Sequence, residues 1–392
     1  MGSLRRWGAL LSLTLGGFAI GCNEFLAMGV LPEAAAELTG GGSGNDAVGS
    51  ASIFVWGYAA GVVLGALAVG PIARFLRARL FLCVSLLAMA VITLGVAWAT
   101  SVEAVVAFRI SSGVPHAAFL GVAAIVAAKL LGRRHEARGV AIVIGGLTIA
   151  SMVGVPLGTW LGQVAGWRWS YLVIGTLFAV AAIGCMLSLS PAPALGSPKG
   201  AWRGLGNRRL WAVITVYALV NSGAFAIITF IAPIITESPG GSAPLVPVLL
   251  AMTGFGMTVG NYVGGALADR SRGVALTSGL ATLAIGYGLL GFSGSLIVTT
   301  LGLALVGYTL GALGPYIQTG LMATTTTNPE LGSSLNSLSA NAGSVIGGVV
   351  GSAALLALGD ARAVVAAAAV LSVAGVGGIA VLSVRDKAAT AR

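Results

Sequence analysis

Long stretches without a single charged residue constrain this chain more than any other feature. The longest, residues 273–329, contains no Asp, Glu, Lys or Arg. A helix crosses a bilayer with about 20 apolar residues, so this stretch is long enough for two helices, with a turn near Gly291–Gly294. Similar runs recur along the chain. They predict twelve membrane-spanning helices, near residues 7–31, 50–70, 80–100, 104–129, 139–162, 170–190, 210–236, 246–268, 274–293, 295–323, 332–357 and 363–384.

The composition excludes a soluble protein. Charged residues make up 8% of the chain, whereas a soluble domain carries about 25%. The mean hydropathy is +0.98. The net charge of +10 does not indicate nucleic-acid binding, because the charges lie in short clusters between apolar runs. We therefore expect the lipid bilayer, and not a nucleic acid, as the partner of this surface.

The positions of the basic residues predict the orientation of the helices, because Lys and Arg concentrate in cytoplasmic loops. If the N-terminus is cytoplasmic, all but three of the 21 Lys and Arg residues lie on the cytoplasmic side. The exceptions are Arg168 and Arg362, which lie outside, and Arg109, which lies within a span. The first apolar run is too long for a cleavable signal and carries Glu24, so it indicates a retained helix. We expect cytoplasmic termini and, from the richness in Ala, Gly and Val, a bacterial cytoplasmic membrane.

A glycine pattern repeats at about half the length of the chain. Gly61, Gly65 and Gly70 near the end of the second predicted helix recur at a constant offset near the end of the eighth, as Gly256, Gly260 and Gly265. Parallel repeats of this kind are typical of transporters. We therefore expect an all-α integral membrane fold of two pseudo-symmetric six-helix halves, residues 1–190 and 210–392, joined by a cytoplasmic linker at 191–209.

Several motifs resemble those of the major facilitator superfamily. Residues 265–270, Gly-Ala-Leu-Ala-Asp-Arg, resemble the family's loop signature in its second-half copy. Residues 109–113 resemble the helix-4 motif, and residues 154–158 resemble the helix-5 motif of antiporters. The opening GGFAIGCNEFLAMGVLP is similar to helix 1 of the twelve-helix drug:proton antiporters. The resemblance implies an exporter and extends over essentially the whole chain.

The resemblance also implies a cytoplasmic latch between the halves, with one departure from the family pattern. The first-half loop has Arg74 where the family usually has Asp, so the latch in this half is weakened or rewired. The alternative for the basic residues of these loops is that they only set the orientation of the helices in the membrane. This alternative does not apply to Asp269. The predicted latch residues are Arg74, Arg77, Asp269, Arg270 and Arg272.

Three residues inside spans are candidates for proton coupling. Glu24 is the only acid within the predicted spans, and an intramembrane acid is a functional hypothesis by default; the alternative is a cap at a helix break. Arg109 lies at a similar depth, roughly 10 Å from the outer end of its helix. We expect protonation of Glu24 to weaken its coupling to Arg109, unless Arg109 only binds backbone carbonyls. His116, two turns beyond Arg109, is either a proton relay or a packed core histidine.

Proline and glycine interrupt the fifth predicted helix. Pro156 removes a backbone hydrogen bond and kinks the helix, and Gly154 and Gly158 allow a neighbouring helix to approach. We interpret the three residues as a bend that allows the halves to rock and limits proton leak; ordinary membrane packing is the alternative.

A substrate pocket is expected near mid-membrane between the halves, lined by apolar and aromatic side chains with a few polar groups. For each aromatic residue, core packing or lipid contact is the alternative. Apart from Glu24 the expected pocket lacks acids, which favours neutral, moderately apolar substrates. The candidates are Asn23, Phe25, Met28, Phe54, Tyr58, Phe119, Tyr217, Asn221, Phe230, Gln318 and Asn341.

Together these features predict a proton-coupled exporter of small amphiphilic molecules such as antibiotics, acting as a monomer. Efflux of a sugar, nucleoside or other metabolite is the nearest alternative. Proton-coupled import, a membrane enzyme and a passive channel fit less well. The sequence has no G-x-x-x-x-G-K-[ST] nucleotide motif and no metal-binding spacing, so we expect no cofactor, no metal and no enzymatic activity.

Overall fold

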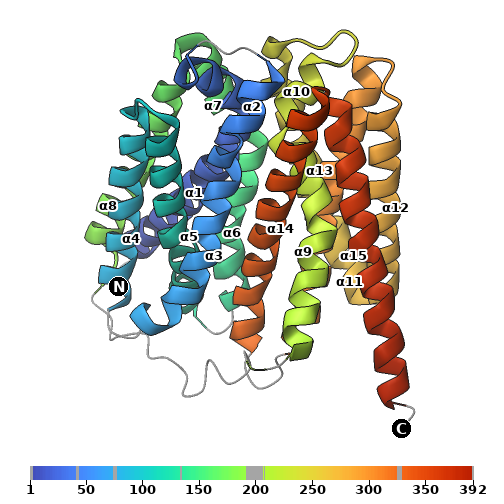
Figure 1. Cartoon of the computed structure of the whole chain (residues 1–392). Coiled ribbons are helices and arrows are strands. Elements are labelled where there is room, and N and C mark those ends of the chain that lie inside the picture. The colour runs from blue at the N-terminus through green and yellow to red at the C-terminus, as the bar shows by residue number, and fades with distance from the viewer. Residues whose placement is uncertain are drawn as a thin grey trace.

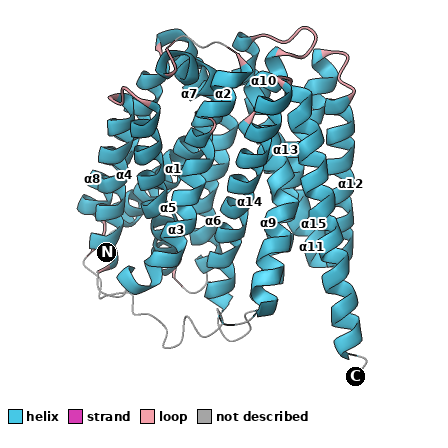
Figure 2. Cartoon of the chain, in the orientation of Figure 1, coloured by secondary structure: helices cyan, strands magenta, loops and turns pink. Residues whose placement is uncertain are grey.

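The computed structural model describes residues 3–40, 44–73, 77–132, 135–190, 206, 208–324 and 329–390, and its elements are helices joined by short loops (Figures 1 and 2). Twelve of the described segments are long and apolar enough to cross a membrane, as the sequence predicts. The elements are α1 (Ser3–Leu38), α2 (Asn45–Ala51), α3 (Ile53–Ala73), α4 (Ala78–Ala97), α5 (Val102–Leu131), α6 (Glu136–Ile149), η2 (Ala150–Gly154), α7 (Val155–Ala165), α8 (Trp167–Ser188), α9 (Arg208–Thr229), α10 (Ile231–Thr236), η4 (Ala243–Leu245), α11 (Val246–Arg270), α12 (Arg272–Gly291), α13 (Leu296–Thr324), α14 (Pro329–Leu358) and α15 (Ala361–Thr390).

The expected turn at Gly291–Gly294 is present between α12 and α13. The single helix expected over 210–236 is instead divided into α9 and α10 at Phe230. Pro233 explains this break, because a proline ring clashes with the carbonyl four residues earlier, here that of Thr229. The first helix is also longer than predicted and continues to Leu38. Most of the predicted linker at 191–209 lies outside the described residues.

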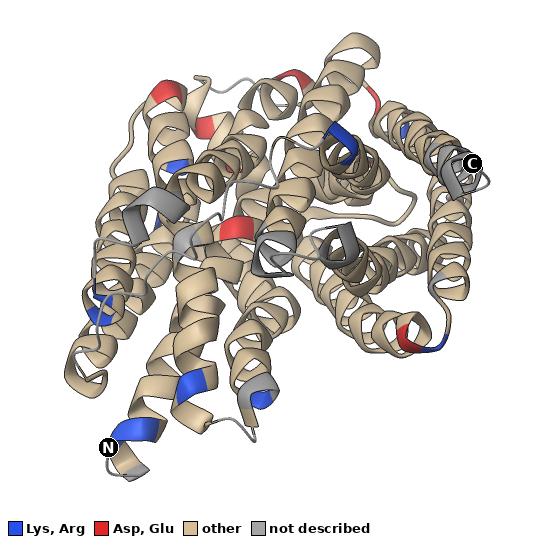
Figure 3. Cartoon of the chain, turned by 90° about the horizontal axis from the view of Figure 1, so that it is seen from below, with Lys and Arg blue, Asp and Glu red and all other residues tan. Residues whose placement is uncertain are grey.

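The charged and aromatic residues are distributed as in a membrane protein. The start of α1 and the end of α15 lie at one end of the bundle, and α2, α7 and α10 lie at the other, which we call the distal end (Figure 1). Exposed Trp98, Trp160 and Trp169 lie near the distal end and exposed Trp7 near the opposite end, as expected for aromatic side chains at the two bilayer surfaces. Seen along the helices, most of the bundle is uncharged (Figure 3).

The repeated glycines make the same contact in each half. A methyl group added at Gly61 of α3 would collide with the carbonyl oxygen of Ile110 in α5, and one added at Gly256 of α11 would collide with that of Ala304 in α13. Each glycine therefore allows two helices to pack backbone against backbone. The sequence repeat thus corresponds to a repeated packing of α3 with α5 and of α11 with α13.

The two halves meet closely at the distal end. Asn45 of α2 donates hydrogen bonds from Nδ2 to Glu237 Oε1 and to the carbonyl oxygen of Gly359, each at 2.7 Å. Gln163 of α7 donates to the carbonyl oxygen of Ala243 at 2.8 Å. Further from this end, the contact becomes apolar.

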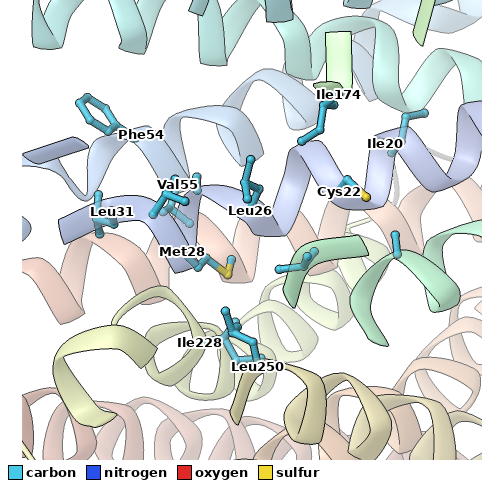
Figure 4. Close-up of a cluster of buried hydrophobic side chains, with 14 of the residues drawn as sticks. Ile20, Cys22, Leu26, Met28, Leu31, Phe54, Val55, Ile174, Ile228 and Leu250 are labelled. Atoms are coloured by element: carbon cyan, nitrogen blue, oxygen red, sulfur yellow. The ribbon is translucent and has the colours of Figure 1, made fainter. Parts of the chain in front are cut away.

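The apolar part of this contact belongs to a core that spans both halves. Met28 of α1 projects toward Ile228 of α9 and Leu250 of α11 (Figure 4). The three side chains are at most 5% exposed. Met28, one of the candidate substrate residues, therefore lies between the halves and packs against the C-terminal half in this conformation.

Candidate functional site

The close packing of α3 and α5 positions the candidate coupling residues. Ser101 caps the start of α5, its hydroxyl accepting a hydrogen bond from the Ala104 amide at 3.2 Å. One turn after Arg109, Gly113 leaves no room for a side chain against the backbone of α3 at Tyr58. This approach brings the side chain of Arg109 into the space between α1, α3 and α5.

Arg109 is completely buried and binds backbone groups of two neighbouring helices. Its Nε donates to the carbonyl oxygen of Phe54 in α3 at 2.8 Å. Its Nη1 donates to the carbonyl oxygen of Asn23 in α1 at 2.5 Å and to the side-chain Oδ1 of the same residue at 3.1 Å. A buried charge is tolerated when its donors are satisfied. The guanidinium therefore ties α5 to both α1 and α3.

Tyr58 connects Arg109 with His116. The Arg109 guanidinium carbon lies 4.5 Å from the centre of the Tyr58 ring, a distance suited to a cation–π interaction. The Tyr58 hydroxyl and His116 Nδ1 are hydrogen-bonded at 2.9 Å. Both side chains are at most 2% exposed. We call Asn23, Tyr58, Arg109 and His116 the buried polar cluster.

Glu24 lies at the edge of this cluster. It is half-buried, and its backbone carbonyl oxygen accepts a hydrogen bond from Arg109 Nη2 at 3.4 Å. The hydrogen bond between the two residues thus involves the backbone of Glu24 and not its carboxyl group. The geometry places the acid next to the guanidinium, and the proposed charge coupling remains a prediction.

The C-terminal half has an apolar counterpart to this site. Gly307 of α13 contacts the Thr253 carbonyl as Gly113 of α5 contacts that of Tyr58. The residue four positions before Gly307, equivalent to Arg109, is the fully buried Leu303. The buried charge at this position of the repeat is therefore a feature of the N-terminal half.

The interrupted fifth helix contains a π-helical segment, η2, between α6 and α7. The Val155 amide donates to the carbonyl of Ala150, one residue further back than in an α-helix. Gly154 lies against Cys22 and Phe18 of α1. π-Helical turns are frequently found at functional sites, and this turn lies where the sequence predicts the bend.

The same turn contacts the other half. A side chain added at Gly254 of α11 would collide with the carbonyl oxygen of Ser151 in η2. The second motif glycine, Gly158, faces Leu26 of α1. The bend therefore lies between the first helix, which carries Glu24, and the C-terminal half.

The candidate substrate residues of the N-terminal half occupy different environments. Asn23, Phe54 and Tyr58 bind or contact Arg109, and Phe25 is half-buried. Phe119 is fully buried and faces Gly16 of α1, so it lies in the core of its own half. Sequence reasoning did not connect Tyr58 with His116, because the two residues come from different helices.

The candidates of the C-terminal half are mostly buried. The rings of Tyr217 and Tyr316 meet edge to face at 6.0 Å. Asn221 of α9 faces Gly343 of α14.

Asn341 donates from Nδ2 to the Ser337 carbonyl at 2.9 Å, while its buried Oδ1 has no hydrogen-bond partner. Gln318 is half-buried and Phe230 is fully buried at the break between α9 and α10.

The predicted latch is only partly visible. Arg77, Asp269 and Arg270 are exposed. Arg74 lies outside the described residues, and Arg272 starts α12 with a side chain that is not described. The hydrogen bonds of Asn45 and Gln163 at the distal end were not predicted, because the sequence of one amide residue does not indicate its partner.

Known proteins resemble this chain along its length. The family model described as Major Facilitator Superfamily matches residues 13–328 and 214–392. The inner membrane transport protein YdhP of Escherichia coli (strain K12) is 31% identical over 361 residues, 89% of each chain. The chloramphenicol resistance protein of Streptomyces lividans is 30% identical over 344 residues, 86% of each.

Two kinds of solved structure share the fold. A bacterial homologue of the human lysosomal transporter Spinster, in an inward-facing, unoccupied conformation, has a TM-score of 0.73 and 15% identity, covering 98% of each chain. The nucleoside transporter NupG has a TM-score of 0.70 and 12% identity, covering 95% of this chain and 99% of its own. These structures show the shared fold, and the family match and the relative of 31% identity show that this multi-pass membrane protein belongs to the major facilitator superfamily.

Proposed function

We propose that the protein is a proton-coupled exporter of small amphiphilic molecules, in the manner of a drug antiporter. The observation that carries this proposal is the half-buried acid Glu24 beside the fully buried Arg109 in a major facilitator transporter. The similarity to a chloramphenicol resistance protein supports an antibiotic as the exported molecule. The asymmetric distribution of Lys and Arg supports cytoplasmic termini in a bacterial cytoplasmic membrane, and we propose that the protein acts as a monomer.

The proposed coupling follows from the charges around α1. An ionised Glu24 is attracted by the adjacent guanidinium, and this attraction is strong where water is excluded. Protonation removes the attraction and leaves the backbone hydrogen bonds of Arg109 in place. Because α1 also packs on η2 and α7, a change in its position alters the contact with the C-terminal half. Proton binding would thereby favour one of two arrangements of the halves.

His116 has a separate proposed role. Its Nδ1 is bonded to the Tyr58 hydroxyl, and Tyr58 lies on the guanidinium of Arg109. A proton could pass between these groups if a second acceptor came within reach of the imidazole. The alternative is that the pair only satisfies two buried polar groups.

The two ends of the bundle would open in turn. The hydrogen bonds of Asn45 and Gln163 close the distal end in this structure. We propose that the loops around Arg77 and Asp269, with Arg74, Arg270 and Arg272, form the corresponding contact when the opposite end closes. The substrate would be bound between the halves near Met28, Asn221 and Asn341.

Drug susceptibility in a pump-deficient bacterium tests the proposal. Wild type is expected to confer resistance to some compounds of an antibiotic panel, and Glu24→Gln is expected to abolish that resistance at equal expression. The matched control is Glu103→Gln, which removes an exposed acid from the start of α5. Resistance that persists in Glu24→Gln would reject Glu24 as the coupling residue.

Efflux of a hydrogen-bonding metabolite is the second candidate function. Asn341 Oδ1 is buried without a partner, and a site with an unpaired amide oxygen favours a ligand that donates hydrogen bonds. If wild type is present in the membrane and confers no resistance, efflux of labelled sugars and nucleosides from loaded vesicles becomes the decisive measurement. Equal efflux by wild type and by Asn341→Leu would reject this assignment of the amide.

A further inference from the structure

A cavity lies between the two halves at the distal end, about 210 Å³ in volume. Both halves form its wall, so it exists only when this end is closed. The N-terminal half contributes seven lining residues and the C-terminal half five. The apolar part of the wall includes Pro32 and Val48 from one half, and Pro233 and Val246 from the other. The cavity is separate from the buried polar cluster, none of whose members lines it.

Glu33 is the charged residue among those that line this cavity. It lies beyond the span predicted for the first helix, but α1 continues to Leu38 and carries it between the halves. Its Oε2 is buried and has no hydrogen-bond partner, although Gln163 interacts with the carboxyl group. A buried carboxylate oxygen without a donor is unfavourable unless a ligand supplies one.

Apart from the contact of Gln163 with the Glu33 carboxyl group, the side chains around the cavity direct their donors to other acceptors. Asn45 donates to Glu237 and to the Gly359 carbonyl, and Gln163 Nε2 donates to the Ala243 carbonyl. The Thr236 hydroxyl donates within its own helix, to the carbonyl of Ala232 at 3.1 Å. The groups of these side chains that remain able to bind a ligand are therefore acceptor oxygens. The cavity is rich in acceptors and lacks a positive charge.

We propose that this cavity binds the protonated amine of a small organic cation, with Glu33 as its counter-ion. An ammonium group supplies both the positive charge and the hydrogen-bond donors that the site lacks. The proline and valine side chains would cover an apolar body attached to it. The volume is below the roughly 300–1,000 Å³ of pockets for drug-sized ligands, which favours a small amine.

The inference rests on the proposed function where it assigns the site a role. In an exporter, the cavity would hold a cation close to the distal exit after it has passed the centre of the membrane. Glu33 adds an acid at the distal end, apart from the mid-membrane pocket that is expected from the sequence to lack acids other than Glu24. Cationic amphiphiles therefore join neutral ones as expected substrates.

Binding can be measured independently of export. The full-length protein in lipid nanodiscs is titrated calorimetrically at pH 7 with 2-phenylethylamine, a small primary ammonium, and with 2-phenylethanol, its neutral counterpart; empty nanodiscs correct for partition into lipid. Wild type is expected to bind the amine saturably and the alcohol at least ten-fold more weakly. Glu33→Gln is expected to lose at least ten-fold in amine affinity. Asp46→Asn, which removes an exposed acid nearby, is expected to bind like wild type.

A second variant keeps the test decisive if Glu33→Gln fails to fold. Val48→Phe retains the carboxyl group and fills part of the cavity, so it is expected to prevent amine binding. Equal amine affinity in wild type and in either cavity variant overturns the proposal, as does equal affinity of wild type for amine and alcohol. Amine binding that depends on Glu33, in a protein that exports no compound, would reject the proposed export and keep the site.

Discussion

Arg109 shows how this protein keeps a charge inside a membrane. Its guanidinium is satisfied chiefly by backbone carbonyls of α1 and α3, and the ring of Tyr58 covers one face. Such groups cannot be lost by side-chain rotation, so the arginine holds three helices in a defined arrangement. The same contacts place Glu24 beside the guanidinium, which is the arrangement that the proposed coupling requires.

At the residue scale, Tyr58→Phe separates the two roles of the Tyr58–His116 pair. The ring remains under Arg109, but the 2.9 Å hydrogen bond to His116 is lost. Leaving the buried imidazole unpaired is expected to lower the free energy of unfolding by about 1–3 kcal/mol, measured by denaturation in detergent. If His116 relays protons, substrate-driven proton flux in proteoliposomes also falls several-fold. A stability loss with unchanged proton flux would assign the pair a structural role.

Single elements also carry functional information, and the fifth span is the clearest example. Its π-helical turn precedes Pro156, and Ser151 within it contacts the other half at Gly254. A π-turn leaves backbone groups less regularly bonded than an α-helix does. Helices commonly kink at such turns and at prolines, so we expect any change in the bend of this span to occur here.

At the element scale, Gly254→Ala is expected to weaken closure of the distal end. The added methyl group would collide with the Ser151 carbonyl, and this contact exists only while the halves are together. Labelling of Gln163→Cys by a membrane-impermeant maleimide should then become several-fold faster. Gly145→Ala, whose methyl group would meet nothing within 4 Å, is the matched control. Unchanged labelling would show that α11 and η2 adjust without separating.

For the whole molecule, the two halves repeat the same packing but not the same chemistry. The glycine contacts of α3 with α5 recur between α11 and α13, while Leu303 replaces the buried Arg109. Proton coupling would therefore be a property of the N-terminal half, and the C-terminal half would contribute the buried amides. In the proposed mechanism, the halves separate at the distal end, where hydrogen bonds join them in this structure.

At this scale, a disulfide across the halves is expected to stop transport. A Cβ at Gly348 of α14 would lie 2.7 Å from Cβ of Trp56 in α3. This is shorter than the roughly 3.5–4.5 Å between the Cβ atoms of a disulfide, so the bond can form once the two helices move slightly apart. Oxidised Trp56→Cys/Gly348→Cys protein should lose transport in vesicles, and a reductant should restore it. Each single variant serves as a control. Full transport by the cross-linked protein would mean that α3 and α14 stay together throughout the cycle.

The twelve spans, the turn at Gly291–Gly294 and the repeated glycine pattern could be predicted from the sequence. The length of an apolar run and its lack of charge are sufficient to predict a span. In lipid, a single segment satisfies its backbone hydrogen bonds by forming a helix. The sequence also identified Glu24, Arg109 and His116 as unusual, because a polar group at membrane depth is costly whatever its neighbours are.

Which of these groups contact one another depends on how the helices pack. The hydrogen bond between Tyr58 and His116 and the position of Glu33 in a cavity between the halves were not predicted. The break at Phe230 and the π-turn were also not predicted. A soluble helix reveals its buried face by an apolar stripe. A membrane helix is apolar on all sides, so its rotation, and with it every contact between side chains of different helices, is set by packing alone.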